Sequence, residues 1–83
     1  MATAKVYVYL KEGILDPQGK AVLHILQNMD VTEVEDVRVG KMVTLKFRPG
    51  LSQKEIAEKT EEICKKLLAN PVIEDYHFEI ELD

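Results

Sequence analysis

The chain has 83 residues, 46% of them hydrophobic and 31% charged, so residues 1–83 have room for one small globular domain with a single core. Its formal net charge of −4 argues against nucleic acid and anionic membranes as main partners, since both attract basic surfaces. The single cysteine cannot form an internal disulfide, and no apolar run approaches the ~20 residues that span a bilayer. We therefore expect a cytoplasmic protein. A domain of this size buries only roughly 60–65% of the surface that its unfolded chain exposes, so its stability is marginal and association with other chains would relieve this.

The first predicted element is a strand over residues 5–10, rich in β-branched and aromatic residues. Alternation places Val6, Val8 and Leu10 on one face and Tyr7 and Tyr9 on the other. The first face is the more apolar one, so we expect it to contact the core.

A helix is predicted from Pro17 to Met29, with apolar residues at helical spacing along one stripe: Val22, Ile25, Leu26 and Met29. Asp16 suits the N-cap, and Pro17 suits the first helical position. Gly19 in the first turn costs ~1 kcal/mol relative to alanine, which raises the question of what it provides. It could admit an anion or allow close packing against another backbone. We favour packing, because Asp16 would repel an anion.

The segment from 34 to 48 is predicted to be extended, in one of two forms. Five of its apolar residues have odd numbers, so a single strand would place them on one face: Val37, Val39, Val43, Leu45 and Phe47. A two-residue hairpin at Gly40 and Lys41 would turn the last three to the wrong face. What remains is one long strand bent or bulged at Gly40, or a hairpin whose three-residue loop pairs Val39 with Val43.

A second helix is predicted from the capping box of Ser52 and Glu55 through Leu68, and Asn70-Pro71 ends it. The last strand follows over residues 72–82, with apolar and polar residues alternating. Its outward acidic row could lie beside a basic row if the two strands are neighbours: Asp75, Glu79 and Glu81 beside Arg38, Lys46 and Arg48.

Together these elements predict an α+β fold, a two-layer sandwich in the order β-α-β-α-β. The sheet is expected to be mainly antiparallel, with both helices on one face. The other face would carry Tyr7, Tyr9, Met42 and Thr44 among charges, a mixture typical of an interface. We take these four residues as candidates for self-association.

The sequence shows no constellation of side chains that a stand-alone enzyme would need. His24 lies on the polar helix face, and Cys64 lies on the apolar stripe of the second helix, where a thiol is usually inert. His77 lies between two acidic residues with no further histidine or cysteine nearby, which makes a poor metal site. No glycine-rich phosphate loop is present. We expect this chain to contribute no catalytic residue, no metal ligand and no cofactor site.

Three segments, in order and covering nearly the whole chain, resemble the PurS family, the small subunit of phosphoribosylformylglycinamidine synthase. They are KEGILDPQG at 11–19, followed by Ala21-Val22, VRVGK at 37–41 and CKKLLANPVIEDY at 64–76. The resemblance implies a non-catalytic subunit of a glutamine amidotransferase ligase complex at the fourth step of de novo purine biosynthesis. It implies a homodimer, or a tetramer, that bridges a PurQ-type glutaminase and a PurL-type ATP-dependent synthetase and assists ammonia transfer. The complex would use ATP, magnesium and glutamine, none of them bound by this subunit.

The loop from Gly13 to Gly19 is the element that we expect to face these partners, and its candidate contact residues are Leu15, Asp16, Pro17, Gln18 and Gly19. We expect Gly19→Val to leave the domain folded and to weaken assembly. Arg38, Gly40 and Lys41 are further candidates, with plain surface charge as the alternative interpretation. Two other function classes stay open, a ferredoxin-like regulatory module that binds a small ligand and a stand-alone enzyme.

Overall fold

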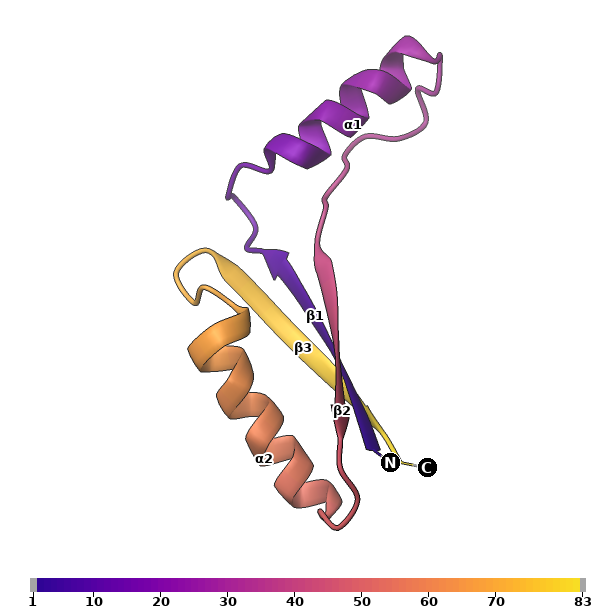
Figure 1. Cartoon of the computed structure of the whole chain (residues 1–83). Helices are drawn as coiled ribbons and strands as arrows, with labels where there is room; N and C mark the ends of the chain where they lie inside the picture. Colours follow the sequence, from indigo (N-terminus) through magenta and orange to yellow (C-terminus); the bar gives the residue numbers. More distant parts are fainter. Residues whose placement is uncertain (1, 83) are drawn as a thin grey trace.

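The computed structural model describes residues 2–82, which form a three-stranded antiparallel sheet and two helices (Figure 1). The strands are β1 (Ala2–Leu10), β2 (Lys41–Phe47) and β3 (Glu74–Glu81), in the order β2-β1-β3. The central strand β1 is antiparallel to both neighbours. This confirms the predicted α+β class, the antiparallel sheet and the order of the elements.

The helices begin where the capping residues predict. Helix α1 (Pro17–Asn28) has Asp16 as its N-cap, and α2 (Gln53–Ile63) begins with both hydrogen bonds of the capping box between Ser52 and Glu55. One turn of π-helix, η1 (Cys64–Leu68), continues α2 and ends where the Ala69 N–H donates to the Cys64 carbonyl at 3.0 Å. None of the helices in the part that the structure describes is long and apolar enough to cross a membrane.

The core lies between the sheet and the helical segment α2–η1. Its buried residues come from β1, from η1 and from the cap that follows it, and half-buried residues of β2, β3 and η1 pack around them: Val6, Val8, Cys64 and Ala69, then Val43, Leu45, Leu68, Tyr76 and Phe78. Val6 lies opposite Val43 on one side and Phe78 on the other. The alternation read from the sequence therefore assigned the inner face of each strand correctly.

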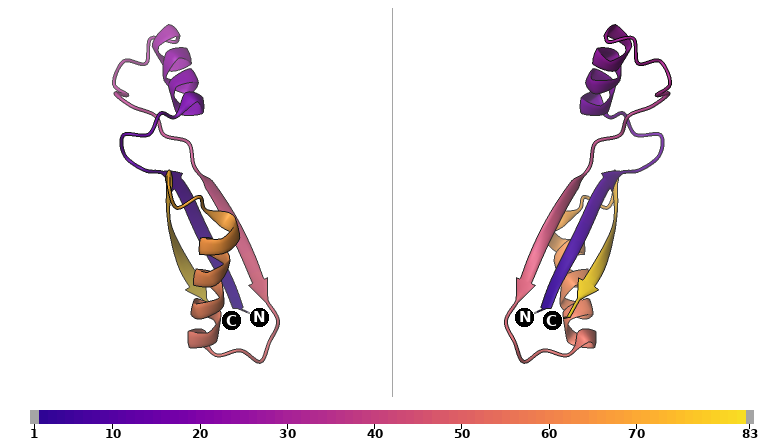
Figure 2. Two further views of the ribbon diagram at one scale, coloured as in Figure 1. Left: turned by 90° about the vertical axis from the view of Figure 1, so that its left-hand side faces the viewer. Right: turned by 90° about the vertical axis from the view of Figure 1, so that its right-hand side faces the viewer.

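Helix α1 does not cover the sheet, and in this respect the expected sandwich was wrong. Figures 1 and 2 show α1 beyond the end of the sheet, past the point where β1 ends. Its apolar stripe is open to solvent, with Ile25 57% and Met29 63% exposed. The molecule measures 52 × 28 × 14 Å, and its radius of gyration of 16.5 Å exceeds the ~12 Å of a compact domain of this length. The cause is the path of the chain, which turns back after α1 and then continues through Gly40 into β2 without a hairpin (Figure 1).

The middle segment forms one strand, and it is shorter than predicted. Pairing with β1 begins only at Lys41, opposite Val8, and residues 32–40 lead into it without a hairpin. The expected charge pairing between the last and the middle strand was also wrong, because β1 separates β3 from β2. The acidic residues of β3 pair with lysines of β1 and the following loop instead: Glu81 with Lys5 at 3.0 Å and Asp75 with Lys11 at 3.5 Å.

Candidate subunit interface

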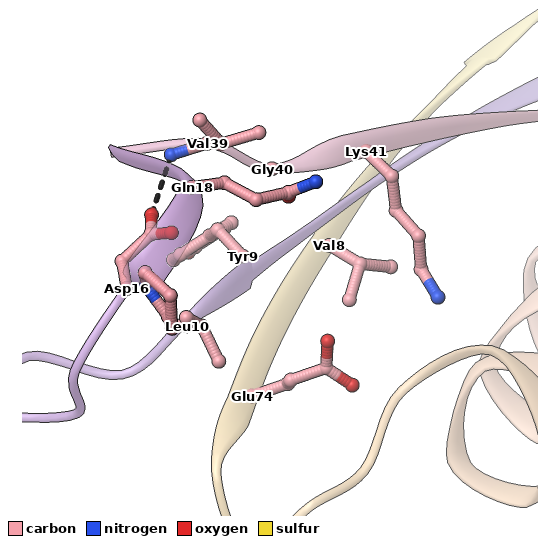
Figure 3. A pocket seen from close by; sticks show the side chains of 10 residues that line it. Val8, Tyr9, Leu10, Asp16, Gln18, Val39, Gly40, Lys41 and Glu74 are labelled. Atoms are coloured by element: carbon pink, nitrogen blue, oxygen red, sulfur yellow. Dashed lines mark hydrogen bonds between the residues drawn. The ribbon is translucent and has the colours of Figure 1, made fainter. Parts of the chain in front are cut away.

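The base of α1 is hydrogen-bonded to the extended segment before β2 through one buried carboxylate, that of Asp16, which is 4% exposed. Its Oδ1 accepts a hydrogen bond from the Gly19 N–H at 2.9 Å, and its Oδ2 accepts one from the Val39 N–H at 2.6 Å (Figure 3). These two N–H groups hold the pKa of Asp16 below its ordinary value, because they stabilise the charged carboxylate. The same side chain therefore caps the helix and joins two segments that are far apart in sequence.

Gly19 provides close packing against a backbone within the same chain. A Cβ atom at this position would lie 2.1 Å from the Val37 carbonyl oxygen. The predicted reason for the glycine, backbone packing, is confirmed. The expectation that Gly19→Val would leave the domain folded stays a prediction, and this contact makes the variant less stable because the added carbons would overlap the chain's own backbone unless it shifts.

Arg38 closes the loop that leads to α1. Its guanidinium donates to the Ile14 carbonyl at 3.0 Å and to the Lys11 carbonyl at 3.2 Å. These bonds to uncharged oxygens assign Arg38 a positioning role rather than that of plain surface charge. Together Asp16 and Arg38 fix the geometry of the loop from residue 11 to 16 against residues 37–39.

A hollow of about 270 Å³ opens beside this joint (Figure 3). Five of the eight predicted partner-facing residues line it: Asp16, Pro17, Gln18, Gly40 and Lys41. Leu15 and Arg38 line a neighbouring hollow, and Gly19 is buried. Val8, Leu10 and Glu74 also line the first hollow. The sequence analysis did not predict these three residues, because it could not show that the start of β3 lies beside the end of β1, where Glu74 pairs with Leu10.

The open face of the sheet carries the four candidates for self-association, as predicted. Tyr7 pairs in register with Met42 of β2, and Thr44 lies opposite Lys5. The structure adds His77, whose ring stacks on Tyr7 at 4.8 Å between centroids and lies 5.9 Å from Tyr9. The outward parity of His77 in the last strand was the available signal, but the strand order was needed to place it beside the tyrosines.

Large apolar side chains open to solvent are the most prominent surface groups in residues 2–82. Within this range no three His, Cys, Asp or Glu side chains gather closely enough to hold a metal ion. Cys64 is fully buried, and burial raises the pKa of its thiol, so it stays neutral and unreactive. The features that stand out are apolar residues open to solvent, including Leu15 at 63% and Met42 at 55%.

A family model described as PurS, phosphoribosylformylglycinamidine (FGAM) synthase, matches residues 3–82. The chain belongs to the PurS family. Subunit PurS of Bacillus subtilis is 51% identical over 81 residues, which cover 98% of this chain and 94% of the relative. Subunit PurS of Methanocaldococcus jannaschii is 38% identical over 81 residues, with 98% and 96% covered.

Solved PurS structures share the fold over the whole chain. Bacillus subtilis PurS has a TM-score of 0.86 at 50% identity and covers 99% of this chain and 100% of its own. The Methanocaldococcus jannaschii protein, described as one of the subunits of formylglycinamide ribonucleotide amidotransferase in the purine biosynthetic pathway, has a TM-score of 0.88 at 36% identity, with 100% and 99% covered. Membership of this family makes the chain a subunit of the synthase in purine biosynthesis.

Proposed function

We propose that the chain is the non-catalytic coupling subunit of the synthase complex in the cytoplasm. In this role it brings a PurQ-type glutaminase, which releases ammonia from glutamine, to a PurL-type synthetase. The synthetase uses that ammonia and ATP to convert formylglycinamide ribonucleotide to formylglycinamidine ribonucleotide. The observation that supports the proposal is the PurS family match over residues 3–82, on a chain whose exposed groups suit contact rather than chemistry.

PurL- and PurQ-type subunits are the proposed partners because a relative from Thermotoga maritima has been solved as PurLQS. The hollow at the base of α1 is the proposed contact for these subunits. ATP, magnesium and glutamine belong, in this proposal, to the larger subunits. The same family match leaves no support for the small-ligand regulatory module.

We further propose that the chain acts as a homodimer, with a tetramer as the larger alternative. Exposed apolar residues on α1 and on the open sheet face support self-association, since a monomer would leave both in water: Val22, Ile25, Met29, Tyr9 and Met42.

The experiment that tests the coupling role measures formylglycinamidine ribonucleotide formation by the cognate glutaminase and synthetase with ATP and magnesium. With glutamine as nitrogen source, product is expected only when this chain is added. With an ammonium salt, synthesis is expected without it. Equal rates with and without the chain on glutamine would contradict the proposal.

A pair of variants tests the proposed contact surface. Lys41→Glu reverses an exposed charge on the rim of the hollow, whereas Lys54→Glu makes the same change on the exposed first turn of α2. Only the first is expected to raise the concentration of chain needed for half-maximal glutamine-dependent activity. Equal effects of the two would remove the hollow as the contact.

A further inference from the structure

Strand β3 forms an edge of the sheet that no other element of residues 2–82 covers. The sheet has the order β2-β1-β3, so one side of β3 pairs with β1 and the other side is free (Figure 2). Every second residue of an edge strand directs its N–H and C=O groups away from the sheet. Within the described chain, residues 75–81 make no backbone-to-backbone hydrogen bond outside the pairing with β1. A further strand can therefore pair along this edge.

The edge of β3 lacks most of the features that protect edge strands from pairing. Proline, bulges and very short strands are common means of such protection. The eight residues Glu74–Glu81 include no proline, and they pair with β1 in continuous register from Leu10 to Thr3. An average strand has ~5–6 residues, so this edge is also long. What it does carry is charge, since four of its eight side chains are acidic.

The core-facing side of β3 is incompletely covered. Tyr76, Phe78 and Ile80 share this side, and each of them is only half-buried. Helix α2 packs against β1 and β3, and its Glu61 accepts a hydrogen bond from the Tyr76 hydroxyl at 2.7 Å, which fixes that ring. A strand added beside β3, with apolar residues at alternate positions, would cover the exposed parts of these side chains and extend the same core.

The other side of β3 carries an acidic row, which consists of Asp75, Glu79 and Glu81. Lys11 and Lys5 pair with the first and the last of these acids, but the side chains of Asp75 and Glu81 remain 53% and 56% exposed. Glu79 makes no ion pair with another residue of the range 2–82. A strand added at this edge would meet an excess of negative charge, which lysine or arginine directly opposite would neutralise.

The acidic row disfavours a second copy of β3 as the added strand. In a two-fold antiparallel pair centred on His77, Asp75 of one copy would lie opposite Glu79 of the other. A pair centred on Phe78 would place Asp75 opposite Glu81, and a pair centred on Glu79 would place this residue opposite its own copy. Like charges directly opposite each other are destabilising. The edge therefore suits a different chain, one that carries positive charge.

We propose that an extended segment of one of the larger synthase subunits pairs with the free edge of β3. The segment alternates lysine or arginine, opposite the acidic row, with apolar residues beside Tyr76, Phe78 and Ile80. Backbone hydrogen bonds give such a contact its affinity, and the alternating side chains give it specificity. The contact rests on the coupling role proposed above. It is continuous with the hollow at the base of α1, because Glu74, the first residue of β3, lines that hollow.

A charge reversal tests the chemistry of the added segment. Glu79→Lys places a cation in the acidic row, whereas Glu58→Lys makes the same change on the exposed side of α2. Both variants are expected to fold, because both side chains are exposed. Only Glu79→Lys is expected to raise the concentration of chain needed for half-maximal glutamine-dependent activity, by about tenfold. Equal activity curves for the two variants would overturn the proposal.

Hydrogen–deuterium exchange of the natural chain, read by mass spectrometry, tests the pairing without any variant. The chain is measured alone at two concentrations and together with the cognate glutaminase and synthetase. About half of the backbone amides of residues 74–81 are expected to become protected only in the mixture, because alternate N–H groups point to the free edge. Protection that rises with the concentration of the chain alone would overturn the proposal in favour of a second copy.

The same mixture separates this proposal from the coupling role. Unchanged exchange of residues 74–81 in a mixture that forms product from glutamine would overturn the pairing of β3 and leave the coupling role standing. Protection of these residues in a mixture that forms no product would support the pairing and contradict the coupling role. Unchanged exchange without product formation would overturn both.

Discussion

Gly19→Ala is the substitution that most directly tests the packing at the base of α1. Gly19 is the third residue of the helix, and a Cβ built there lies 2.1 Å from the Val37 carbonyl oxygen and 2.9 Å from its carbonyl carbon. Non-bonded heavy atoms approach favourably to ~3.5 Å, so the oxygen would have to move by more than 1 Å. Both contacts are with backbone, which cannot swing aside as a flexible side chain can.

Two opposing effects decide the magnitude. Helix propensity alone favours alanine over glycine by up to ~1 kcal/mol. Forcing an extra carbon into a packed site usually costs ~1–3 kcal/mol, and a 1 Å backbone shift belongs to the upper part of that range. We therefore expect Gly19→Ala to lower the free energy of unfolding by about 1–2 kcal/mol, although it replaces the poorest non-proline helix former with the best.

The measurement is urea unfolding followed by circular dichroism, at two protein concentrations so that dissociation is separated from unfolding. Ala21→Gly is the matched control, since Ala21 is exposed in the same helix and the reverse exchange there reports propensity without a clash. It is expected to destabilise by no more than ~1 kcal/mol. A Gly19→Ala protein as stable as the natural one, or more stable, would refute the packing argument and leave the role of this glycine to be sought at a partner surface.

Three further predictions concern single groups. The pKa of Asp16 is lowered in the folded state, so its contribution to stability is present above the ordinary pKa of an aspartate and is lost as pH falls toward the folded value. Asp16→Asn should therefore lower the urea midpoint at pH 7 and make the midpoint fall less steeply between pH 5 and 3. A midpoint that falls as steeply in the variant as in the natural protein would contradict this. The Tyr76 hydroxyl donates to Glu61 at 2.7 Å, and this bond raises the pKa of Tyr76 to about 12, so its contribution to folding stability is present below pH 10 and lost as pH rises toward 12. Tyr76→Phe should lower the free energy of unfolding by ~1 kcal/mol at pH 7 and remove the dependence of stability on alkaline pH. A variant as stable as the natural protein at pH 7 would contradict this. The buried Cys64 thiol should react with a thiol reagent only at the rate of unfolding, and rapid reaction of the folded protein would show that η1 opens locally.

The elements that the sequence predicted correctly are those fixed by local physics. The capping box of α2 and the N-cap of α1 are defined by residues three positions apart, and the face of each strand follows from a period of two. The backbone packing of Gly19 was also predicted, because a glycine in a helix needs a compensating contact. What the local pattern left undetermined was the partner of that contact, the Val37 carbonyl, because the two residues are eighteen positions apart.

The wrong position of α1 has one physical cause, the path of the chain through Gly40. Local rules left the hairpin and the straight strand both open, since the odd parity of the apolar residues suits either. The register of β2 against β1 shows why the straight path is kept. A three-residue turn would use residues 40–42, but Lys41 and Met42 already pair with Val8 and Tyr7 of β1. From this one local outcome follow the displaced α1, the elongated shape and the free edge of β2.

An apolar stripe in a sequence predicts that a surface will be buried, but it does not say which copy of the chain buries it. The stripe of α1 fits a sandwich closed by its own sheet and a sandwich closed by another chain's sheet equally well, because the contacts would be nearly the same in both. The homodimer proposed above would bury this stripe, whereas a monomer leaves Ile25 and Met29 in water.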